Sequence, residues 1–99
     1  MFPPITKYRV VGESMEPTFR EGDTVIVFRH AYLIIKPKKG HIVLLFHPKK
    51  HIPLIKRITN VTKEKIFVRG DNAKKSSDSR HFGWAEKKDI LGKVLYAFP

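Results

Sequence analysis

Cysteine is absent from this chain of 99 residues. Its absence excludes a disulfide scaffold, a thiolate zinc site and a cysteine nucleophile, and it fits a reducing compartment. Long apolar runs are also lacking: one of the longest is "IVLLF", at residues 42–46, whereas a membrane span needs about 20 apolar residues. We therefore expect no transmembrane segment, and a chain that is cytoplasmic or peripheral at a membrane.

Acidic residues are scarce. The chain has 20 Lys and Arg against 9 Asp and Glu, which gives a formal net charge of +11. Such a charge attracts nucleic acid, an anionic membrane surface or an acidic protein, or it serves solubility alone. Hydrophobic residues make up 41% of the chain, which is enough for a small packed core. The length suits a single domain over residues 1–99.

The chain also lacks helical periodicity: no window shows a long helical period. Prolines and glycines separate short stretches rich in Val, Ile and Phe, as in all-β domains. The predicted strands are residues 8–11, 24–29, 42–46, 54–61, 65–69 and 91–97. "NVTKEK" predicts a turn, "RGDNAKKSSDSRHFG" a long ordered loop and "WAEKKDI" a single helical turn. We predict a mostly-β fold, a small coiled antiparallel sheet or partly open barrel.

A serine stands between the first two predicted strands, in the stretch "GESMEPT". Ser14 could start a turn that Pro17 helps to set, or it could be an exposed nucleophile. A serine hydroxyl becomes a good nucleophile only when a nearby base takes its proton. None of the five histidines lies in an obvious motif, so a lysine is the candidate base.

Lys56 is that candidate, in the stretch "PLIKRI". Strand alternation places Lys56 on the same face as Leu54 and Ile58, with Arg57 on the opposite face. An ordinary lysine has a pKa of ~10.4 and a useful base needs ~7–8. Burial among apolar groups, or a neighbouring cation, lowers the pKa in this direction. The alternative is an edge-strand lysine that prevents aggregation.

A third stretch, "GDNAKKSSDSRHFG", contains Ser76, Asp78 and Arg80. Taken alone it predicts a polar loop closed by a contact between Asp78 and Arg80. Together the three stretches resemble the type I signal peptidase family, serine–lysine peptidases related to the LexA-type self-cleaving repressors. The resemblance runs from Gly12 to the C-terminus. Its third motif is the most specific part, because a motif as short as Ser-Met-x-Pro recurs by chance.

The resemblance implies a fold of the LexA and signal peptidase type, and a role for each matching residue. Ser14 would be the nucleophile and Lys56 the general base, with the Ser76 hydroxyl orienting the lysine amine. Met15 would pack beside the nucleophile. The backbone N–H of Ser14 would face the developing oxyanion. Many members carry a serine hydroxyl in this oxyanion hole at the position that is Gly12 here.

The remaining motif residues would support the loop. Asp78 and Arg80 would brace it together with Arg57, and Gly70 and Asp71 would shape the turn into it. Bacterial signal peptidases have membrane anchors and an extra β domain, and we expect neither here. The size and the third motif resemble the small proteases that mature nickel-type superoxide dismutase. The implied activity is removal of an N-terminal leader from a client precursor, without a cofactor.

Three other interpretations remain to be compared with this one. General signal peptidase-like processing of secreted precursors would need a membrane partner. A LexA-like regulator would need a scissile Ala-Gly bond, and the chain has no such pair. A basic β-barrel could bind nucleic acid, but the basic runs lack interleaved aromatic residues, so we expect no nucleic acid. The positive surface could instead favour acidic clients or an anionic membrane.

A metal site is a further candidate. His47 and His51 are four residues apart, a spacing that suits a helix, but Pro48 and the neighbouring lysines predict a loop. We therefore expect no metal at this pair.

Overall fold

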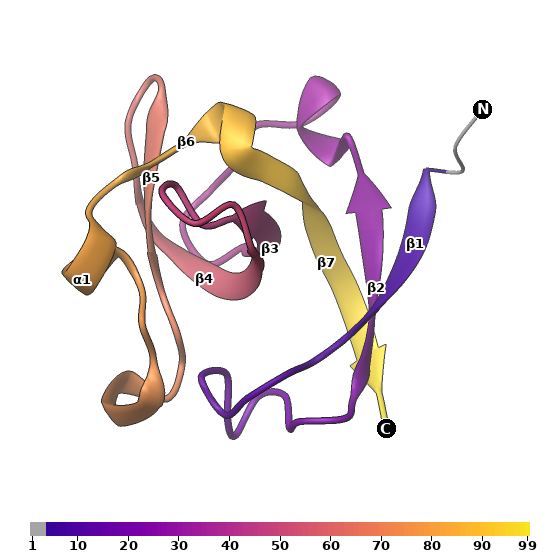
Figure 1. Ribbon diagram of the computed structural model, residues 1–99. Helices are drawn as coiled ribbons and strands as arrows, with labels where there is room; N and C mark the ends of the chain where they lie inside the picture. Colours follow the sequence, from indigo (N-terminus) through magenta and orange to yellow (C-terminus); the bar gives the residue numbers. More distant parts are fainter. Residues whose placement is uncertain (1–3) are drawn as a thin grey trace.

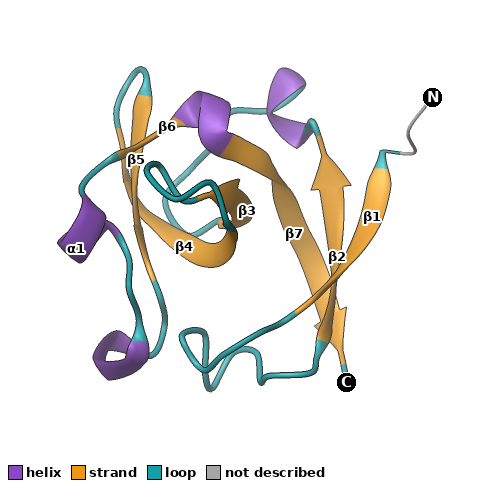
Figure 2. Cartoon of the chain, in the orientation of Figure 1, coloured by secondary structure: helices purple, strands orange, loops and turns teal. Residues whose placement is uncertain are grey.

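The computed structural model describes residues 4–99 and shows a curled antiparallel sheet with a few very short helices (Figures 1 and 2). The strands are β1 (Ile5–Arg9), β2 (Thr24–Arg29), β3 (Ile42–Phe46), β4 (Pro53–Val61), β5 (Lys65–Arg69), β6 (Ala85–Glu86) and β7 (Ile90–Phe98). The predictions of a mostly-β fold and of a coiled antiparallel sheet are confirmed. Residues 1–3 of the predicted domain lie outside the described part.

The strands follow the spatial order β1-β2-β7-β3-β4-β5-β6, and each neighbouring pair is antiparallel. The last strand, β7, lies between β2 and β3 and so joins the two halves of the sheet (Figure 1). Strands twist relative to their neighbours, and over seven strands the sheet curls into a half-barrel. The first two strands and the last therefore lie beside each other, although most of the chain separates them.

The core lies on both faces of the curled sheet. Alternate residues of β3 enter two different apolar clusters: Leu44 packs with Val25 and Val27, while Val43 and Leu45 pack with a second group. The second group also holds Ile58, Ile66, Val68 and Ala85. Burial on both faces explains why β3 reads as an uninterrupted apolar run rather than an alternating one.

The first predicted strand ends too late. β1 stops at Arg9, whereas the prediction continued to Val11. Val10 leaves the strand because its N–H donates to the carbonyl of Asp23, and its own carbonyl accepts from Gly22 N–H. These two bonds close residues 10–23 into a loop that carries Ser14. The neighbouring Gly12 has a φ of 81°, a left-handed conformation that glycine adopts without strain.

The helical segments are η1 (Ala31–Leu33), η2 (Ala73–Lys75), α1 (Ser79–Phe82) and η3 (Lys87–Asp89). The predicted loop at residues 69–83 thus contains η2 and α1, although its first residue, Arg69, still belongs to β5. The helix α1 begins at a capping carboxylate, Asp78. "WAEKKDI" forms β6 followed by η3, close to the predicted helical turn. Within residues 4–99, every helix is too short and too polar to cross a membrane.

The turn predicted at "NVTKEK" is a hairpin between β4 and β5. Residues 62–64 make the connection, and Thr62 N–H donates to the carbonyl of Lys65 over 2.8 Å. The Thr62 hydroxyl accepts from Lys65 N–H over 3.0 Å. The strands pair directly up to the turn, with Val61 opposite Ile66, so the ends of this connection are held side by side.

Candidate active site

The loop of Ser14 is fixed to the core by the residue that follows the serine. The Met15 side chain is 1% exposed and packs in the cluster of Val25 and Val27. Burying a side chain of this size contributes roughly 1.5–3 kcal/mol. Phe19 is buried in the same cluster, and its N–H donates to the Met15 carbonyl over 3.0 Å. Ser14 is only partly buried, so the loop holds its hydroxyl near solvent on a rigid base.

Lys56 reaches this serine from the first half of β4. Its Nζ lies 2.8 Å from Ser14 Oγ, although the two residues are 42 positions apart in the chain. The Lys56 side chain is 3% exposed. Burial is the largest influence on its amine and lowers the pKa below the usual lysine value of 10.5, and the positive charge of Arg80 lowers it further. The negative charge of Asp78 acts in the opposite direction. The net direction favours the neutral amine.

Asp78 is the centre of a buried hydrogen-bond network beside this pair. Its carboxylate is fully buried and accepts from the Ser76 hydroxyl over 2.7 Å and from Gly70 N–H over 2.9 Å. Arg80 Nε donates to the other oxygen over 2.9 Å. Burial alone raises the pKa of the Asp78 carboxyl, but the bonds from Arg80, Ser76 and the backbone outweigh it and hold the pKa well below its usual range. Asp78 therefore stays ionised.

Ser76 is buried, and its hydroxyl accepts from Gly70 N–H over 3.1 Å while donating to Asp78. Among residues 4–99, the hydrogen-bond partner of the Lys56 amine is Ser14 Oγ. The predicted role of Ser76 in orienting the amine thus stays a prediction. What the structure brings together at Asp78 is Ser76, Arg80 and the backbone of Gly70.

Arg57 contacts the same loop at a different point. Its Nε and one terminal nitrogen donate to the two oxygens of Asp71, each over 2.9 Å, and its other terminal nitrogen donates to the Gly40 carbonyl over 3.0 Å. Thr18 Oγ1 donates to Asp71 as well. Arg57 therefore braces the beginning of the loop through Asp71 rather than joining Asp78 and Arg80.

Asn72 is a site residue that the sequence analysis did not single out. Its backbone N–H donates to the Ser14 carbonyl over 2.8 Å, and its side-chain amide donates to the Glu13 carbonyl over 3.2 Å. These bonds tie the Ser14 loop to the third motif. The signal was present in the sequence, because Asn72 completes the Gly-Asp-Asn triplet at the start of that motif.

Gly70 allows this close approach. A Cβ at this position would lie 2.2 Å from Ser76 Oγ and 2.5 Å from the Ser14 carbonyl oxygen. A backbone carbonyl cannot move aside cheaply, so Gly70→Ala should lower the free energy of unfolding by about 1–3 kcal/mol and displace Ser14. We expect cleavage by the folded G70A variant to fall as well, measured at a temperature well below its melting point.

Gly92→Ala is the matched control for this prediction. A Cβ at Gly92 would lie 2.6 Å from the Phe28 carbonyl oxygen, in another part of the sheet. G92A should therefore lose comparable stability while its folded fraction keeps normal activity. Equal loss of activity per folded molecule in both variants would contradict the positioning role of Gly70.

Two backbone N–H groups near the serine differ in their availability. Gly12 N–H donates to Glu21 Oε1 over 2.8 Å, so it is already engaged. Among the described residues, the backbone N–H of Ser14 has no hydrogen-bond acceptor. The Ser14 N–H is thus free to bind an incoming oxygen atom, whereas Gly12 offers neither a hydroxyl nor a free N–H.

A small cavity opens beside Ser14 and Lys56. Two segments line it, residues 8–15 on one side and residues 53–56 on the other, and its volume is about 60 Å³. The lining side chains are Tyr8, Val10, Val11, Met15, Pro53, Leu54 and Ile55 in addition to the serine and the lysine. Most of the lining side chains are apolar, Ser14 and Lys56 add polar surface, and the cavity has room for a small side chain.

One edge of β4 is open at this cavity. Residues 53–57 of β4 pair with β3 on one side. On the other side, the pairing with β5 begins only at Arg57. Within residues 4–99, the backbone of residues 54–56 therefore has an unpaired edge next to Ser14, and an extended peptide can add to such an edge.

His47 and His51, the candidate metal pair, lie at the two ends of a turn. His47 is buried, and its Nδ1 accepts from the backbone N–H groups of Lys49 and Lys50 over 3.0 and 3.1 Å. The predicted loop at this position is confirmed, because residues 47–52 contain no helix. Nδ1 of His47 is thus engaged by the backbone of its own turn.

Comparison with known proteins agrees with this geometry. The chain matches the model of the family described as "Signal peptidase, peptidase S26" over residues 2–61 and 58–98. It is similar to Signal peptidase IB of Staphylococcus aureus (strain N315), with 33% identity over 95% of this chain and 78% of the relative. That alignment spans 149 positions, so at least 50 of them face no residue of this 99-residue chain.

A eukaryotic relative is also similar. The signal peptidase complex catalytic subunit SEC11 of Metarhizium acridum (strain CQMa 102) is 30% identical over 91% of this chain and 56% of the relative. The family model covers nearly the whole chain in two segments. The chain therefore belongs to the signal peptidase family, peptidase S26, and is a serine peptidase of the signal peptidase type.

Proposed function

We propose that Ser14 and Lys56 form a serine–lysine dyad that hydrolyses one peptide bond behind the N-terminal leader of a client protein. The observation that carries this proposal is the distance of 2.8 Å between Ser14 Oγ and the Nζ of a buried lysine. A nucleophile and its base must lie within hydrogen-bond reach in this way. Three further features support it: the free Ser14 N–H, the lowered pKa of Lys56 and the open strand edge.

The first half of the reaction forms an ester. The neutral Lys56 amine takes the proton of Ser14 Oγ, and the oxygen attacks the carbonyl carbon of the scissile bond. The negative charge that develops on the carbonyl oxygen is stabilised by the Ser14 N–H. The Lys56 ammonium then gives its proton to the leaving nitrogen, the C–N bond breaks, and the leader remains attached to Ser14 as an acyl ester.

The second half removes the leader. Lys56 is neutral again and takes a proton from a water molecule, which attacks the ester carbon. Collapse of this intermediate releases the leader carboxylic acid, and Lys56 returns the proton to Ser14 Oγ. One water is consumed and one peptide bond is cut, and no cofactor takes part.

Arg80 has an electrostatic part in this mechanism. Asp78 raises the pKa of Lys56 and Arg80 lowers it. Because Arg80 binds the buried Asp78 carboxylate directly, it neutralises a charge that would otherwise hold Lys56 in the ammonium form. Asp78 can thus organise Ser76 and Gly70 while Lys56 stays available as a base.

The substrate would lie extended along the open edge of β4. Residues 54–56 offer backbone groups for pairing, and the cavity of about 60 Å³ would accept a side chain of the leader just before the cut. Its small size favours residues such as alanine, glycine or serine there. The client precursor of a nickel-type superoxide dismutase is the first candidate, on the resemblance to the small proteases that mature it.

The test is cleavage of a panel of leader peptides with mass spectrometry of the products. The panel includes a nickel-type superoxide dismutase precursor, secretory signal peptides, and versions in which the residue before the cut is enlarged from alanine to leucine. We expect a single cut after a small residue, and loss of that cut in the leucine version. Cleavage that is indifferent to this residue would contradict the cavity as the specificity site.

A further inference from the structure

An apolar tip follows strand β2 and points away from the core. It consists of residues 33–35, Leu33-Ile34-Ile35, in which Leu33 is 84% and Ile34 78% exposed, and Ile35 is exposed as well. Exposed leucines and isoleucines are common one at a time, but three in sequence at the end of a turn are not. This tip contributes nothing to the core that the sheet encloses.

The turn that presents the tip is firmly held. Ala31 is fully buried, and the Tyr32 hydroxyl bonds His41 Nδ1 over 2.9 Å while the two rings stack. Ile34 N–H and Ile35 N–H both bond the Ala31 carbonyl over 3.0 Å. The exposure of the tip is therefore built into the structure of η1.

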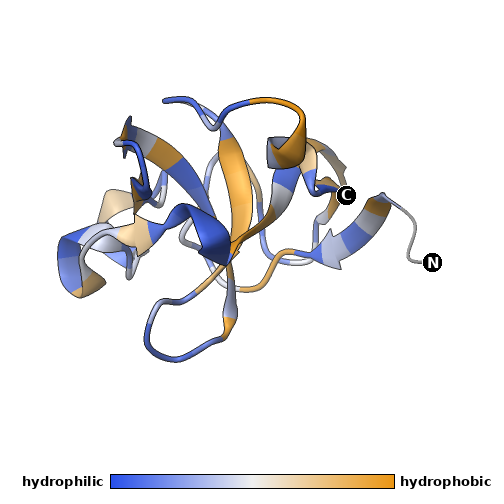
Figure 3. Ribbon diagram, turned by 90° about the horizontal axis from the view of Figure 1, so that it is seen from above, coloured by the Kyte–Doolittle hydropathy of each residue, from blue (hydrophilic) through white to orange (hydrophobic). Residues whose placement is uncertain are grey.

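Lysines follow the tip directly. Lys36, Lys38 and Lys39 are all exposed, and no acidic residue occurs between Asp23 and Glu64 in the sequence. Figure 3 looks onto this end of the molecule and shows hydrophobic and strongly hydrophilic segments side by side. An exposed apolar group is thus followed directly by three exposed positive charges.

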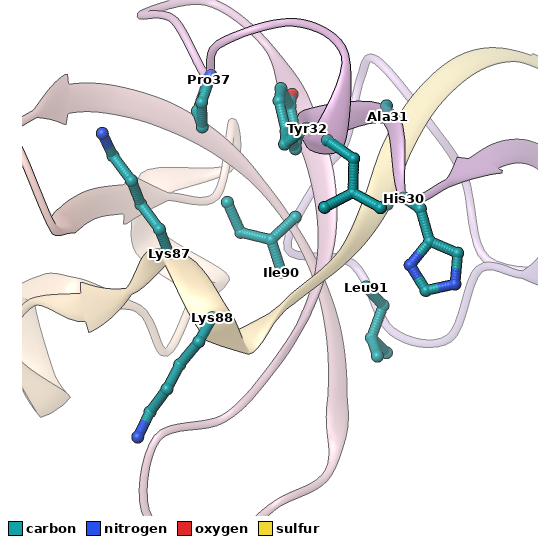
Figure 4. A pocket seen from close by; sticks show the side chains of 10 residues that line it. His30, Ala31, Tyr32, Pro37, Lys87, Lys88, Ile90 and Leu91 are labelled. Carbon is teal, nitrogen blue, oxygen red and sulfur yellow. The ribbon is translucent and has the colours of Figure 1, made fainter.

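A hollow beside the tip also combines apolar side chains with lysines. It has a volume of about 340 Å³ and lies between η1 and the beginning of β7. Figure 4 shows Ile90 in the middle of the lining residues, with Lys87 and Lys88 on one side and His30 and Leu91 on the other. Lys88 pairs with Glu86 over 3.0 Å, so Lys87 adds to the positive charge contributed by the lysines after the tip.

We propose that the apolar tip, residues 33–35, inserts into the surface of an anionic phospholipid bilayer, with Lys36, Lys38 and Lys39 binding the lipid head groups. Apolar side chains that enter the acyl boundary and cations that remain at head-group level are the two components of peripheral membrane binding. The charge argues for lipid over an apolar protein partner, because an apolar partner surface would leave three lysines without counter-charges.

The proposal does not depend on the proposed function, since no step of the binding uses Ser14 or Lys56. The tip also lies at the opposite end of β2 from the Ser14 loop. That strand has six residues, which at ~3.3 Å per residue amounts to about 20 Å. A bilayer at the tip therefore leaves the candidate active site open to an extended client.

Vesicle sedimentation is the first test. The full chain is mixed with phosphatidylcholine vesicles, or with vesicles that contain 30% phosphatidylglycerol, at ~0.15 M salt. We expect binding to the anionic vesicles. Leu33→Ser combined with Ile34→Ser should weaken it about tenfold or more, and Lys36→Gln combined with Lys38→Gln roughly 10- to 30-fold, at about fivefold per lysine.

The controls separate the tip from the overall charge. Lys49→Gln with Lys50→Gln removes the same charge from another turn, and Leu95→Ser with Tyr96→Ser removes exposed apolar side chains of β7. Both double variants should bind nearly as the native chain does. Equal weakening by the tip and control variants would contradict the proposal, because binding would then follow net charge or general hydrophobicity.

A fluorescent probe gives the second test. The chain has no cysteine, so Ile34→Cys and Tyr96→Cys each create a single labelling site for an environment-sensitive dye. We expect a blue shift at position 34 and none at position 96 when anionic vesicles are added. A blue shift at position 34 that appears without vesicles and grows with protein concentration would overturn the proposal and identify the tip as a contact between two copies.

Discussion

Ser14→Ala should abolish leader cleavage, with kcat/KM falling by a factor of about 10³ or more. The reason is that the Ser14 oxygen forms the ester bond in the proposed mechanism, and alanine offers no atom in its place. The measurement is the initial rate on the best peptide of the panel, followed by mass spectrometry over several hours. The Ser14 N–H and the β4 edge remain in S14A, so peptide binding should persist.

The fold should survive this substitution. In the described part of the chain, the Ser14 hydroxyl has one hydrogen bond, which it accepts from Lys56, so S14A should lose only about 1–3 kcal/mol of unfolding free energy. Ser77→Ala is the matched control, because Ser77 is an exposed serine of the third motif, and S77A should cleave normally. Cleavage by S14A at a rate within tenfold of the native chain would exclude Ser14 as the nucleophile.

Lys56→Met and Lys56→Arg should both be inactive, again with a loss of about 10³ or more in kcat/KM. Methionine fills the space of the lysine stem but has no base. Arginine keeps a positive charge and hydrogen-bond donors, yet its guanidinium is not deprotonated in proteins. If charge at this position were sufficient, K56R would retain activity, and such a result would rule out the role of Lys56 as a base.

The native chain should become more active as pH rises, because only the neutral amine can take the proton of Ser14. The activity is low below the pKa of Lys56 and reaches a plateau above it, and burial together with Arg80 moves this pKa below the usual lysine value of 10.5. Arg80→Gln leaves the charge of Asp78 uncompensated, so the midpoint of its pH profile should lie at higher pH. A profile without a rising limb, or an unchanged midpoint in R80Q, would count against this electrostatic arrangement.

Stability offers an independent measure of the same pKa. The folded chain binds the Lys56 proton less tightly than the unfolded chain, so burying the amine costs free energy below the folded pKa. This cost declines as the pH rises from the folded pKa and is gone above the unfolded lysine pKa of 10.5. K56M removes this cost. The difference in unfolding free energy between K56M and the native chain should therefore favour K56M most at neutral pH and little above pH ~10.5. Lys74→Met, at an exposed position, should show no such dependence.

The sheet could be predicted from the sequence because its strands are short apolar stretches between glycines and prolines, and β2, β3 and β5 begin and end where the sequence indicates. Val10 and Val11 were assigned to a strand on their side chains alone. The backbone of Val10 is instead bonded to Gly22 and Asp23, which no local pattern reveals. Likewise α1 has four residues, too few for a helical period to appear.

The proximity of Ser14 to Lys56 was expected from a family resemblance rather than from physical reasoning on either residue. The sequence alone does not show which charged side chains pair with each other in the folded chain. Arg57 could have bound Asp71 or Asp78, since both carboxylates follow within the same motif. Asp78 is occupied by Arg80, two residues away, and Asp71 lies within reach of Arg57, so local geometry decides between them.

The β4–β5 hairpin is a position at which the chain can accept an insertion. Its ends are clamped side by side by the pairing of Val61 with Ile66, and the family model breaks into its two segments at residues 58–61. Closing a longer loop costs only about 0.6 kcal/mol per doubling of its length. A folded module whose own termini lie close together could thus be grafted at residues 62–64 without disturbing the bonds around Ser14, which makes this hairpin a natural attachment point for engineered additions.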